Sequence, residues 1–324
     1  MTEEGAPAPL IVLGVRRSGT TLLRVMLDRH SELAIPDESY FVPQLAERHR
    51  TPVDAAGFLD DLRRLPTLAE WGLLAEDVRP CLRDGMDVGQ AVAAVYEAYA
   101  ARHGKRRWGD KTPMYMQYLG LLRRLFPRAR FVHLIRDGRD AAVSFLGMPD
   151  GVVTRTWAHP RTPAAFACQW RTEVEDARRL GGQVGPGRYL ELRYEELVAS
   201  PEEALARVCS FAGLEPEPGM LAYEGRVDVS GKPHQQSLLR PPTPGLRDWR
   251  TEMDADGVRA FEEVAGDLLA QLGHELRSPE HAGGPSPAGR ARLVGYRFRA
   301  AAWRAAGRGV RRSPAWRRRH PALA

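Results

Sequence analysis

The chain has 324 residues, of which 43% are hydrophobic, which is enough for one α/β enzyme with a sizeable core. It contains no run of 18 or more apolar residues, and its acidic start lacks the basic and apolar parts of a signal peptide, so we expect neither a transmembrane helix nor secretion. Cys81, Cys168 and Cys209 have neither metal-ligand nor disulfide spacing, which indicates ordinary thiols and a cytoplasmic location.

The net charge of +6 comes from the end of the chain. Residues 286–324 contain eleven arginines and no acidic residue. Without them, the 47 basic residues fall to 36 against 41 acidic ones, a net charge of −5. The body of the protein is therefore acidic, and the high isoelectric point does not predict nucleic-acid binding for the whole chain.

The first half of the chain begins with a short apolar run at residues 10–13, which predicts a buried parallel strand. A glycine-bearing turn follows, and then apolar residues at helical spacing over residues 20–29. Residues 53–104 are predicted to be mostly helical, with breaks at Pro66 and Pro80. This start has the order strand, loop, helix.

The second half repeats this alternation. It predicts strands at 130–135 and 188–193, helices at 138–145 and 161–180, and a helix that starts at 200–203. Strands that alternate with helices indicate an α/β fold. We therefore expect a P-loop-like, mainly parallel sheet with helices on both faces, plus a basic C-terminal extension.

Three segments lie outside this regular pattern. Residues 224–250 are polar and rich in proline, which predicts an ordered substrate loop or lid. We expect a catalytic domain at 1–277, a linker at 278–289 and an arginine-rich tail at 290–324. The tail could contact an anionic surface such as lipid or nucleic acid, remain a solvated extension, or form a helix that packs on the body.

The loop from Gly14 to Thr21 has two glycines at the spacing of a phosphate-binding P-loop. Backbone N–H groups in such a turn, and at the start of the following helix, point towards an anion. Thr20 stands where nucleoside triphosphatases have lysine, so a magnesium triphosphate would lack its main partner. Arg17 within the loop could instead serve a phosphate that carries a sulfate.

A second anion site is predicted at the end of the strand at 130–135. Arg136 follows this strand, and Ser144 lies eight residues further along, on the next helix. A guanidinium with a hydroxyl suits a phosphate group at the carboxyl end of a parallel strand. Alternatively, Arg136 and Asp137 form a structural ion pair, the role that we expect for Arg139 and Asp140.

Four segments together resemble the PAPS-dependent sulfotransferases (PAPS is 3′-phosphoadenosine 5′-phosphosulfate), most closely the tyrosylprotein sulfotransferases and bacterial sulfotransferases. They are the loop Arg17–Leu22 with Met26–His30, Trp108–Pro113, Ile135–Asp140 with Ser144, and Leu192–Leu197. The resemblance covers residues 10–275, and the four segments follow one another in the same order as in the family. This chain departs from the family at Arg16, where the family has proline, and at Tyr40, where it has arginine.

The resemblance implies a role for each matching residue. Glu38, with Asp37 as the other member of an acidic pair, would be the general base, and Arg17 and Lys111 would stabilise the transferring sulfuryl group without a metal. The PAPS-binding residues would be Arg17, Ser18, Gly19, Thr20, Thr21, Arg136, Ser144, Tyr194 and Arg240, with Lys232 as an alternative to Arg240. The acceptor would bear a hydroxyl group.

Several of these residues also have structural interpretations. Glu38 could be a turn residue, Tyr194 a core tyrosine, and Trp170 either a neighbour of adenine or part of the core. His133, inside a strand, is expected to be a core residue. Tyr40 in place of arginine favours a small molecule or carbohydrate acceptor over protein tyrosine, with pocket residues expected in 40–75, 145–165 and 224–250.

Two other classes of protein remain open. One is a small-molecule or nucleotide kinase with a degenerate P-loop, which the missing lysine disfavours. The other is a non-catalytic nucleotide-binding protein whose tail grips an anionic surface, which an intact Glu38 and Lys111 disfavour.

Overall fold

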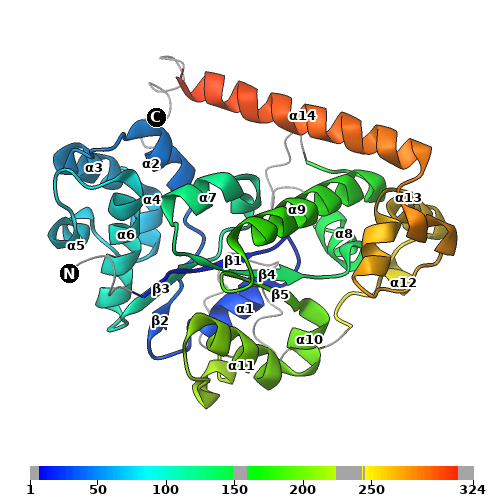
Figure 1. Ribbon diagram of the computed structural model, residues 1–324, viewed down its shortest axis with the longest axis horizontal. Coiled ribbons are helices and arrows are strands. Elements are labelled where there is room, and N and C mark those ends of the chain that lie inside the picture. Colours follow the sequence, from blue (N-terminus) through cyan, green and yellow to red (C-terminus); the bar gives the residue numbers. More distant parts are fainter. Residues whose placement is uncertain (1–6, 149–158, 224–242, 244, 313–324) are drawn as a thin grey trace.

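The computed structural model describes residues 7–148, 159–223, 243 and 245–312 (Figure 1). Its centre is a five-stranded sheet with the order β2-β3-β1-β4-β5, in which every neighbouring pair is parallel. The strands are β1 Leu10–Leu13, β2 Leu33–Ala34, β3 Arg107–Asp110, β4 Arg130–Ile135 and β5 Tyr189–Arg193.

Helices connect the strands. The α-helices are α1 Thr20–Leu27, α2 Val42–Arg48, α3 Ala55–Leu62, α4 Pro66–Glu70, α5 Ala75–Val78, α6 Val88–Arg102, α7 Leu119–Leu125, α8 Gly138–Leu146, α9 Pro163–Val184, α10 Tyr194–Ala199, α11 Pro201–Ala212, α12 Trp249–Glu252, α13 Ala255–Gln271 and α14 Pro287–Arg312. Short 3-10 helices are η2 Arg79–Cys81, η3 Pro113–Gln117, η4 Pro218–Leu221 and η6 Pro279–Gly283.

The central strand β1 is apolar throughout because both of its faces are buried. In β1, Ile11 and Leu13 join a core that includes residues of α6, α7 and α9. Leu10 and Val12 point to the opposite face and pack with residues of α1 and α11. Figure 1 shows α7 and α9 on one side of the sheet and α1 and α11 on the other. The expected α/β fold with a parallel sheet covered on both faces is confirmed.

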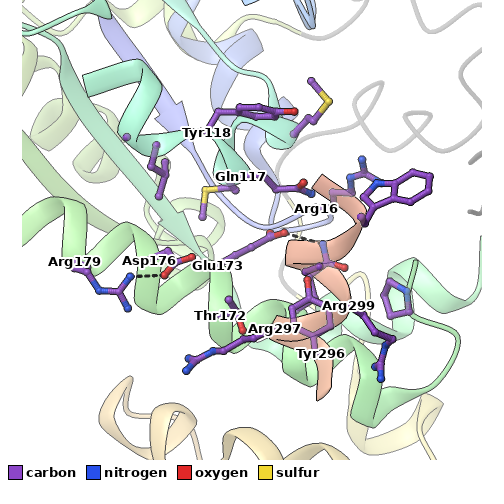
Figure 2. A pocket seen from close by; sticks show the side chains of 18 of the residues that line it. Arg16, Gln117, Tyr118, Thr172, Glu173, Asp176, Arg179, Tyr296, Arg297 and Arg299 are labelled. Atoms are coloured by element: carbon purple, nitrogen blue, oxygen red, sulfur yellow. Dashed lines mark hydrogen bonds and ion pairs between the residues drawn. The ribbon is translucent and has the colours of Figure 1, made fainter. Parts of the chain in front are cut away.

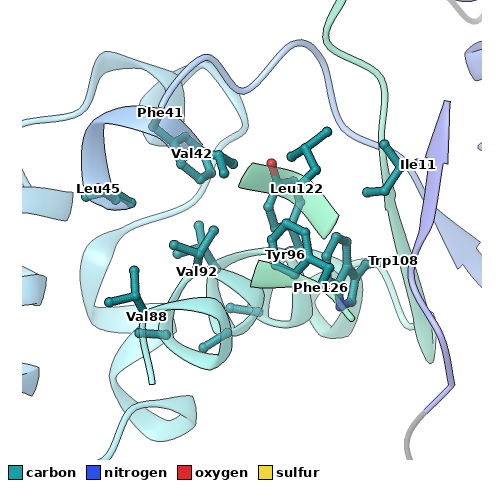
Figure 3. Packing of buried hydrophobic residues seen from close by; sticks show 14 of the residues in the cluster. Ile11, Phe41, Val42, Leu45, Val88, Val92, Tyr96, Trp108, Leu122 and Phe126 are labelled. Carbon is teal, nitrogen blue, oxygen red and sulfur yellow. The ribbon is translucent and has the colours of Figure 1, made fainter. Parts of the chain in front are cut away.

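An aromatic cluster joins the helical region after β2 to the edge of the sheet (Figure 3). Tyr96 of α6 stacks on Trp108 of β3 with ring centroids 4.5 Å apart, and Phe41 lies 5.6 Å from Tyr96. Phe41 follows Glu38 by three residues and is 1% exposed. The core therefore fixes the chain immediately beyond the predicted general base.

The predicted strands and helices around β1 and β4 agree with the structure to within a few residues. The short strands β2 and β3 were not predicted. Strand β3 has the sequence Arg-Trp-Gly-Asp, which carries no apolar alternation. It becomes a strand because it pairs with β1 and β2, and these partners lie far from it in the sequence.

The basic C-terminal segment up to residue 312 is the long helix α14, which lies across α9 and α13 (Figure 1). Leu293 is buried in the same core as those helices. The segment expected to be a linker, 278–289, contains η6 and the start of α14, and the N–H of Ser286 donates to the carbonyl oxygen of Glu263 at 2.9 Å. Of the alternatives for the tail, a helix packed on the body describes this part of the chain.

None of the helices in the described ranges has both the length and the apolar character needed to cross a membrane. The same residues include no cluster of three or more His, Cys, Asp or Glu side chains that could hold a metal ion. The three cysteines are unpaired, and burial raises the pKa of Cys168 and Cys209 to about 11.

Candidate active site

The loop between β1 and α1 has an unusual backbone. Arg17 and Gly19 both have positive φ angles, 71° and 87°. A Cβ atom at Gly19 would lie 2.4 Å from the ring of Tyr194, and one at Gly14 would lie 2.8 Å from the carbonyl oxygen of Leu134. Glycine at both positions therefore lets the loop turn tightly between β4 and Tyr194 and enter α1 directly. The N-terminus of α1 follows at Thr20, as an anion-binding loop requires.

The side chains expected to bind the two phosphate ends of a nucleotide lie together at this loop. Arg17 Nε donates to Ser144 Oγ at 3.0 Å, and Arg136 Nη1 donates to the carbonyl oxygen of Arg17 at 3.3 Å. Burial lowers the pKa of Arg17, and the positive charges of Arg136 and Arg247 lower it further. Arg17 and Arg136 thus concentrate positive charge in a partly buried place, which suits an anion.

Arg136 also stacks on Tyr194, with its guanidinium carbon 4.4 Å from the ring centroid. Within the described part of the chain, Arg136 Nε and Ser18 Oγ are buried and have no hydrogen-bond partner. Buried polar atoms without a partner are costly unless a ligand binds them. Both atoms belong to residues predicted to bind PAPS, so the residues present fit a phosphate-bearing ligand.

The structural ion pair suggested between Arg136 and Asp137 does not form, because Asp137 pairs with Arg139 instead. Asp137 accepts from Arg139 at 2.7 Å, and Arg139 also bonds Glu262 at 2.6 Å. Arg136 has a more distant carboxylate, Asp140, at 3.8 Å. Arg139 is thus the buried structural arginine, and the side chain of Arg136 remains at the loop.

Trp170, which the sequence left open, and His133, which was expected in the core, are both buried in the core. Trp170 is fully buried, and its Nε1 donates to the carbonyl oxygen of Arg136 at 3.2 Å. It holds the backbone of Arg136 from behind the site. His133 is also buried, with Nδ1 2.7 Å from the hydroxyl of Tyr189, and burial lowers its pKa to about 4.

Glu38 and Lys111 form a close ion pair beside the same loop. Lys111 Nζ donates to Glu38 Oε1 at 2.6 Å and to Thr21 Oγ1 at 3.3 Å. The hydroxyl of Tyr40 donates to the other oxygen, Glu38 Oε2. The lysine side chain is 1% exposed, whereas that of Glu38 is 25% exposed. Lys111 therefore joins Glu38 to the loop, and part of the Glu38 side chain stays exposed.

The electrostatics of this pair keep the carboxylate ionised. Burial alone would raise the pKa of Glu38, but the charge and hydrogen bond of Lys111, with a hydrogen bond from Tyr40, hold it below its usual value. Burial lowers the pKa of Lys111, and Glu38 offsets part of that effect. An ionised carboxylate next to a desolvated ammonium group is suited to accept a proton and to stabilise negative charge.

Asp37, the other acid of the pair, is held elsewhere. Its carboxylate lies 2.8 Å from Arg24 Nη2, and Arg24 Nη1 bonds the carbonyl oxygen of Ile35 at 3.2 Å. Asp37 thus has an arginine of α1 as its partner. Glu38 is the member of the pair that contacts Lys111.

A buried hydrogen-bond network fixes the residues next to Glu38 and Lys111. Ser39 Oγ donates to Asp110 Oδ2 at 2.7 Å, Tyr96 OH donates to the same oxygen at 2.9 Å, and Thr112 Oγ1 donates at 3.2 Å. Ser39 Oγ is also 2.7 Å from Tyr115 OH. Burial raises the pKa of Asp110 to about 6 in spite of these donors. The network ties the backbone that carries Glu38 to the backbone that carries Lys111.

Sequence reasoning missed several parts of this site. Ser39 and Asp110 directly flank Glu38 and Lys111, and that adjacency was the available signal. Arg247 lies in the segment expected to form a substrate loop, where a different arginine, Arg240, was predicted to reach the ligand. Arg240 and Lys232 lie outside the described residues.

A pocket of about 650 Å³ opens beside Arg16, between α9, the η3–α7 segment and α14 (Figure 2). From the sequence, residues of an acceptor pocket were expected in 40–75, 145–165 and 224–250. The lining includes residues 159, 160 and 165 from the second of these segments, but most of it comes from 114–120, 169–183 and 296–303. Large parts of the second and third segments lie outside the described residues, so the expected location of the acceptor pocket stays a prediction.

The parallel sheet, the glycine loop and the cluster of arginines define a class of enzyme that binds an anionic ligand at the end of β1. A model of the sulfotransferase family matches residues 9–218, and the chain belongs to this family.

Individual relatives agree with this membership. The chain is 29% identical to nodulation protein NoeE of Sinorhizobium fredii, over 92% of this chain and 74% of that protein. It is 26% identical to protein-tyrosine sulfotransferase 2 of Gallus gallus, over 86% of this chain and 73% of the relative. The sulfotransferase domain of the Synechococcus PCC 7002 olefin synthase has the same fold, with a TM-score of 0.54 and 24% identity over 84% of this chain and 96% of that domain.

Proposed function

We propose that this protein transfers a sulfuryl group from PAPS to a hydroxyl group of an acceptor. The observation that carries the proposal is the connection of two sites through one loop. Arg17 contacts Ser144 and Arg136 on one side, and Thr21 contacts the Lys111–Glu38 pair on the other. A nucleotide donor and an acceptor hydroxyl could therefore meet across the loop.

The donor would be held by its two anionic ends. Arg136 and Ser144, with Tyr194 stacked on Arg136, suit the 3′-phosphate. The backbone N–H groups and hydroxyls of residues 18–21 suit the 5′-phosphosulfate at the start of α1. Arg247 adds positive charge to the same region. The 3′-phosphate contacts would distinguish PAPS from a plain adenylate.

The chemical step follows from the placement of Glu38. Its carboxylate takes the proton of the acceptor hydroxyl as that oxygen forms a bond to sulfur. The bond from sulfur to the bridging phosphate oxygen breaks in line, and adenosine 3′,5′-bisphosphate leaves with the electron pair. Lys111, between Glu38 and Thr21, stabilises the negative charge that develops on the transferring group.

Arg17 would support the same charge from the donor side. In this structure its side chain lies at Ser144, so it connects the sulfate end of the loop to the 3′-phosphate site. The two cations supply the charge stabilisation that we ascribe to the site, and the absence of a metal requirement stays a prediction. The cytoplasmic location also stays a prediction.

Titration calorimetry with adenosine 3′,5′-bisphosphate tests the donor assignment. We expect this product to bind at least about tenfold more tightly than AMP, because one added phosphate gains charge-assisted hydrogen bonds. Arg136→Ala should remove most of the difference, while Arg259→Ala, on the surface of α13, should leave it intact. Equal affinity for the two nucleotides, or phosphoryl transfer from ATP with magnesium, would contradict the proposal.

A further inference from the structure

The pocket beside Arg16 has one wall that belongs to the basic C-terminal helix. Tyr296, Arg299 and Trp303 of α14 line it opposite Tyr118, and α9 forms its floor. Figure 2 shows Tyr118 and Gln117 on one side, Tyr296 and Arg299 on the other, and Glu173 between them. The helix is therefore part of a binding site as well as a cover for the core.

This wall is firmly attached to the body. Leu293 is 7% exposed within the core, and Arg297 Nη2 bonds Glu175 of α9 at 2.8 Å. Arg292 bonds Glu263 of α13 at 2.6 Å. These contacts lie on both helices beneath α14, so the residues of α14 that face the pocket have a defined position.

The pocket reaches the predicted donor loop through Arg16, whereas neither Glu38 nor Lys111 is among its lining residues. Arg16 lines it and immediately precedes Arg17 of the loop, and Met114 lines it three residues after Lys111. Arg16 Nη1 donates to His159 Nε2 at 2.9 Å, which holds the arginine at the pocket wall. The charge of Arg16 also contributes to the lowered pKa of Glu38, as expected for neighbouring groups. A molecule in the pocket would thus contact Arg16, whose charge acts on the predicted general base.

The lining is unusually polar for a pocket of this size, since most small-molecule pockets are lined mainly by apolar groups. Amide, hydroxyl and carboxylate side chains come from Gln117, Thr172 and Glu173 and from Asp176, which pairs with Arg179 at 2.6 Å. Four arginines, Arg16, Arg179, Arg297 and Arg299, add further hydrogen-bond donors, and aromatic rings stand among these groups. Such groups donate and accept hydrogen bonds in several directions, and the rings offer flat apolar surfaces. This combination suits a ring compound with many hydroxyl groups better than it suits a plain phenol or a lipid.

We propose that this pocket binds the acceptor, that α14 forms its outer wall, and that the acceptor is a polyhydroxylated ring compound of mono- or disaccharide size. The inference rests on the proposed sulfuryl transfer. It gives a role to Arg16, the position where the family has proline. It also gives the basic helix a role in acceptor binding, in addition to its packing on the body.

The experiment uses the full chain, radiolabelled PAPS and a panel of p-nitrophenyl glycosides, with p-nitrophenol as the comparison acceptor. We expect label on the sugar of at least one glycoside, at a kcat/KM above that for p-nitrophenol. Trp303→Ala and Tyr118→Ala should each lower this kcat/KM by roughly tenfold, mainly through KM. The matched control is Phe298→Ala, an exposed aromatic residue on the same helix that does not line the pocket, and it should match the wild type.

Binding of adenosine 3′,5′-bisphosphate distinguishes a failure of the proposed function from a failure of the proposed acceptor site. Adenosine 3′,5′-bisphosphate should bind all four proteins equally, and thermal unfolding should show that the variants are folded. If adenosine 3′,5′-bisphosphate does not bind the wild-type protein, the proposed function itself is refuted. If the product binds but p-nitrophenol is preferred to every glycoside, the acceptor class is wrong. If Trp303→Ala and Tyr118→Ala behave like Phe298→Ala, the pocket is not the acceptor site.

Discussion

Two buried polar clusters support the two halves of the site, and they are built differently. Behind Arg136, Arg139 is surrounded by the carboxylates of Asp137 and Glu262, so the cluster consists of ions. Behind Lys111, Asp110 is surrounded by the hydroxyl groups of Ser39, Tyr96 and Thr112. Each cluster comes directly after, or at the end of, a strand that leads into the site.

The difference matches what each half has to do. The donor half must hold a fixed array of positive charge, and buried ion pairs give well-defined geometry at a high cost if one partner is removed. The acceptor half must leave Glu38 and Lys111 to interact with each other, and neutral hydroxyls bond Asp110 without competing for either charge. The two clusters thus fix the backbone of the site in ways that suit binding and proton transfer respectively.

The largest effect on stability should follow from removing the central cation. Arg139→Met leaves Asp137 and Glu262 buried without their partner, so we expect a loss of about 3–5 kcal/mol in the free energy of unfolding, measured with urea. Arg259→Met, which breaks an exposed pair with Asp256, should cost under about 1 kcal/mol. Equal losses in the two variants would show that the ionic cluster has no special role.

Asp110→Ala should cost less, roughly 2–3 kcal/mol, because it leaves neutral hydroxyls without an acceptor instead of leaving buried charges unpaired. It should also reduce kcat while leaving affinity for adenosine 3′,5′-bisphosphate unchanged, since the network supports the Glu38–Lys111 side. Asp110→Asn retains an acceptor oxygen and should lose less. Weaker product binding with normal kcat would reverse the assignment of the clusters to the two halves.

The smallest effect should be a shift in pH dependence. Tyr40 and Lys111 lower the pKa of Glu38, so Tyr40→Phe should raise that pKa by less than about one unit. Because the ionised carboxylate is the active form, the acidic limb of kcat/KM against pH should move to higher pH, and activity should be lost earlier on acidification. Lys111→Met should move the limb further in the same direction. A limb that moves to lower pH would contradict the assigned interactions.

Much of this arrangement was predictable from local sequence. The apolar runs of β1 and β4 and the glycine spacing after β1 located the loop, and the position of Arg136 after β4 indicated that it lies close to that loop. Strand β3 could not be predicted, because Arg107, Gly109 and Asp110 become part of the sheet only through pairing with distant strands. The wall formed by α14 was also hidden, since an arginine-rich segment gives no sign of which surface it will cover.

The roles of individual residues were less accessible than their positions. An Asp-Glu pair does not reveal which acid contacts Lys111, because the partners of the two acids, Arg24 for Asp37 and Lys111 for Glu38, lie elsewhere in the sequence. The first contact comes from α1 and the second from the segment after β3. Only the folded chain brings those partners together.

Glu38→Gln tests the account most directly, with Asp37→Asn as its matched control. Both variants should bind adenosine 3′,5′-bisphosphate as the wild type does. With radiolabelled PAPS and a glycoside or phenol acceptor, Glu38→Gln should lose turnover by roughly 10²–10⁴-fold, the usual contribution of a general base, whereas Asp37→Asn should retain most of it. Retained turnover in Glu38→Gln, or a greater loss in Asp37→Asn, would contradict the assignment of Glu38 as the base.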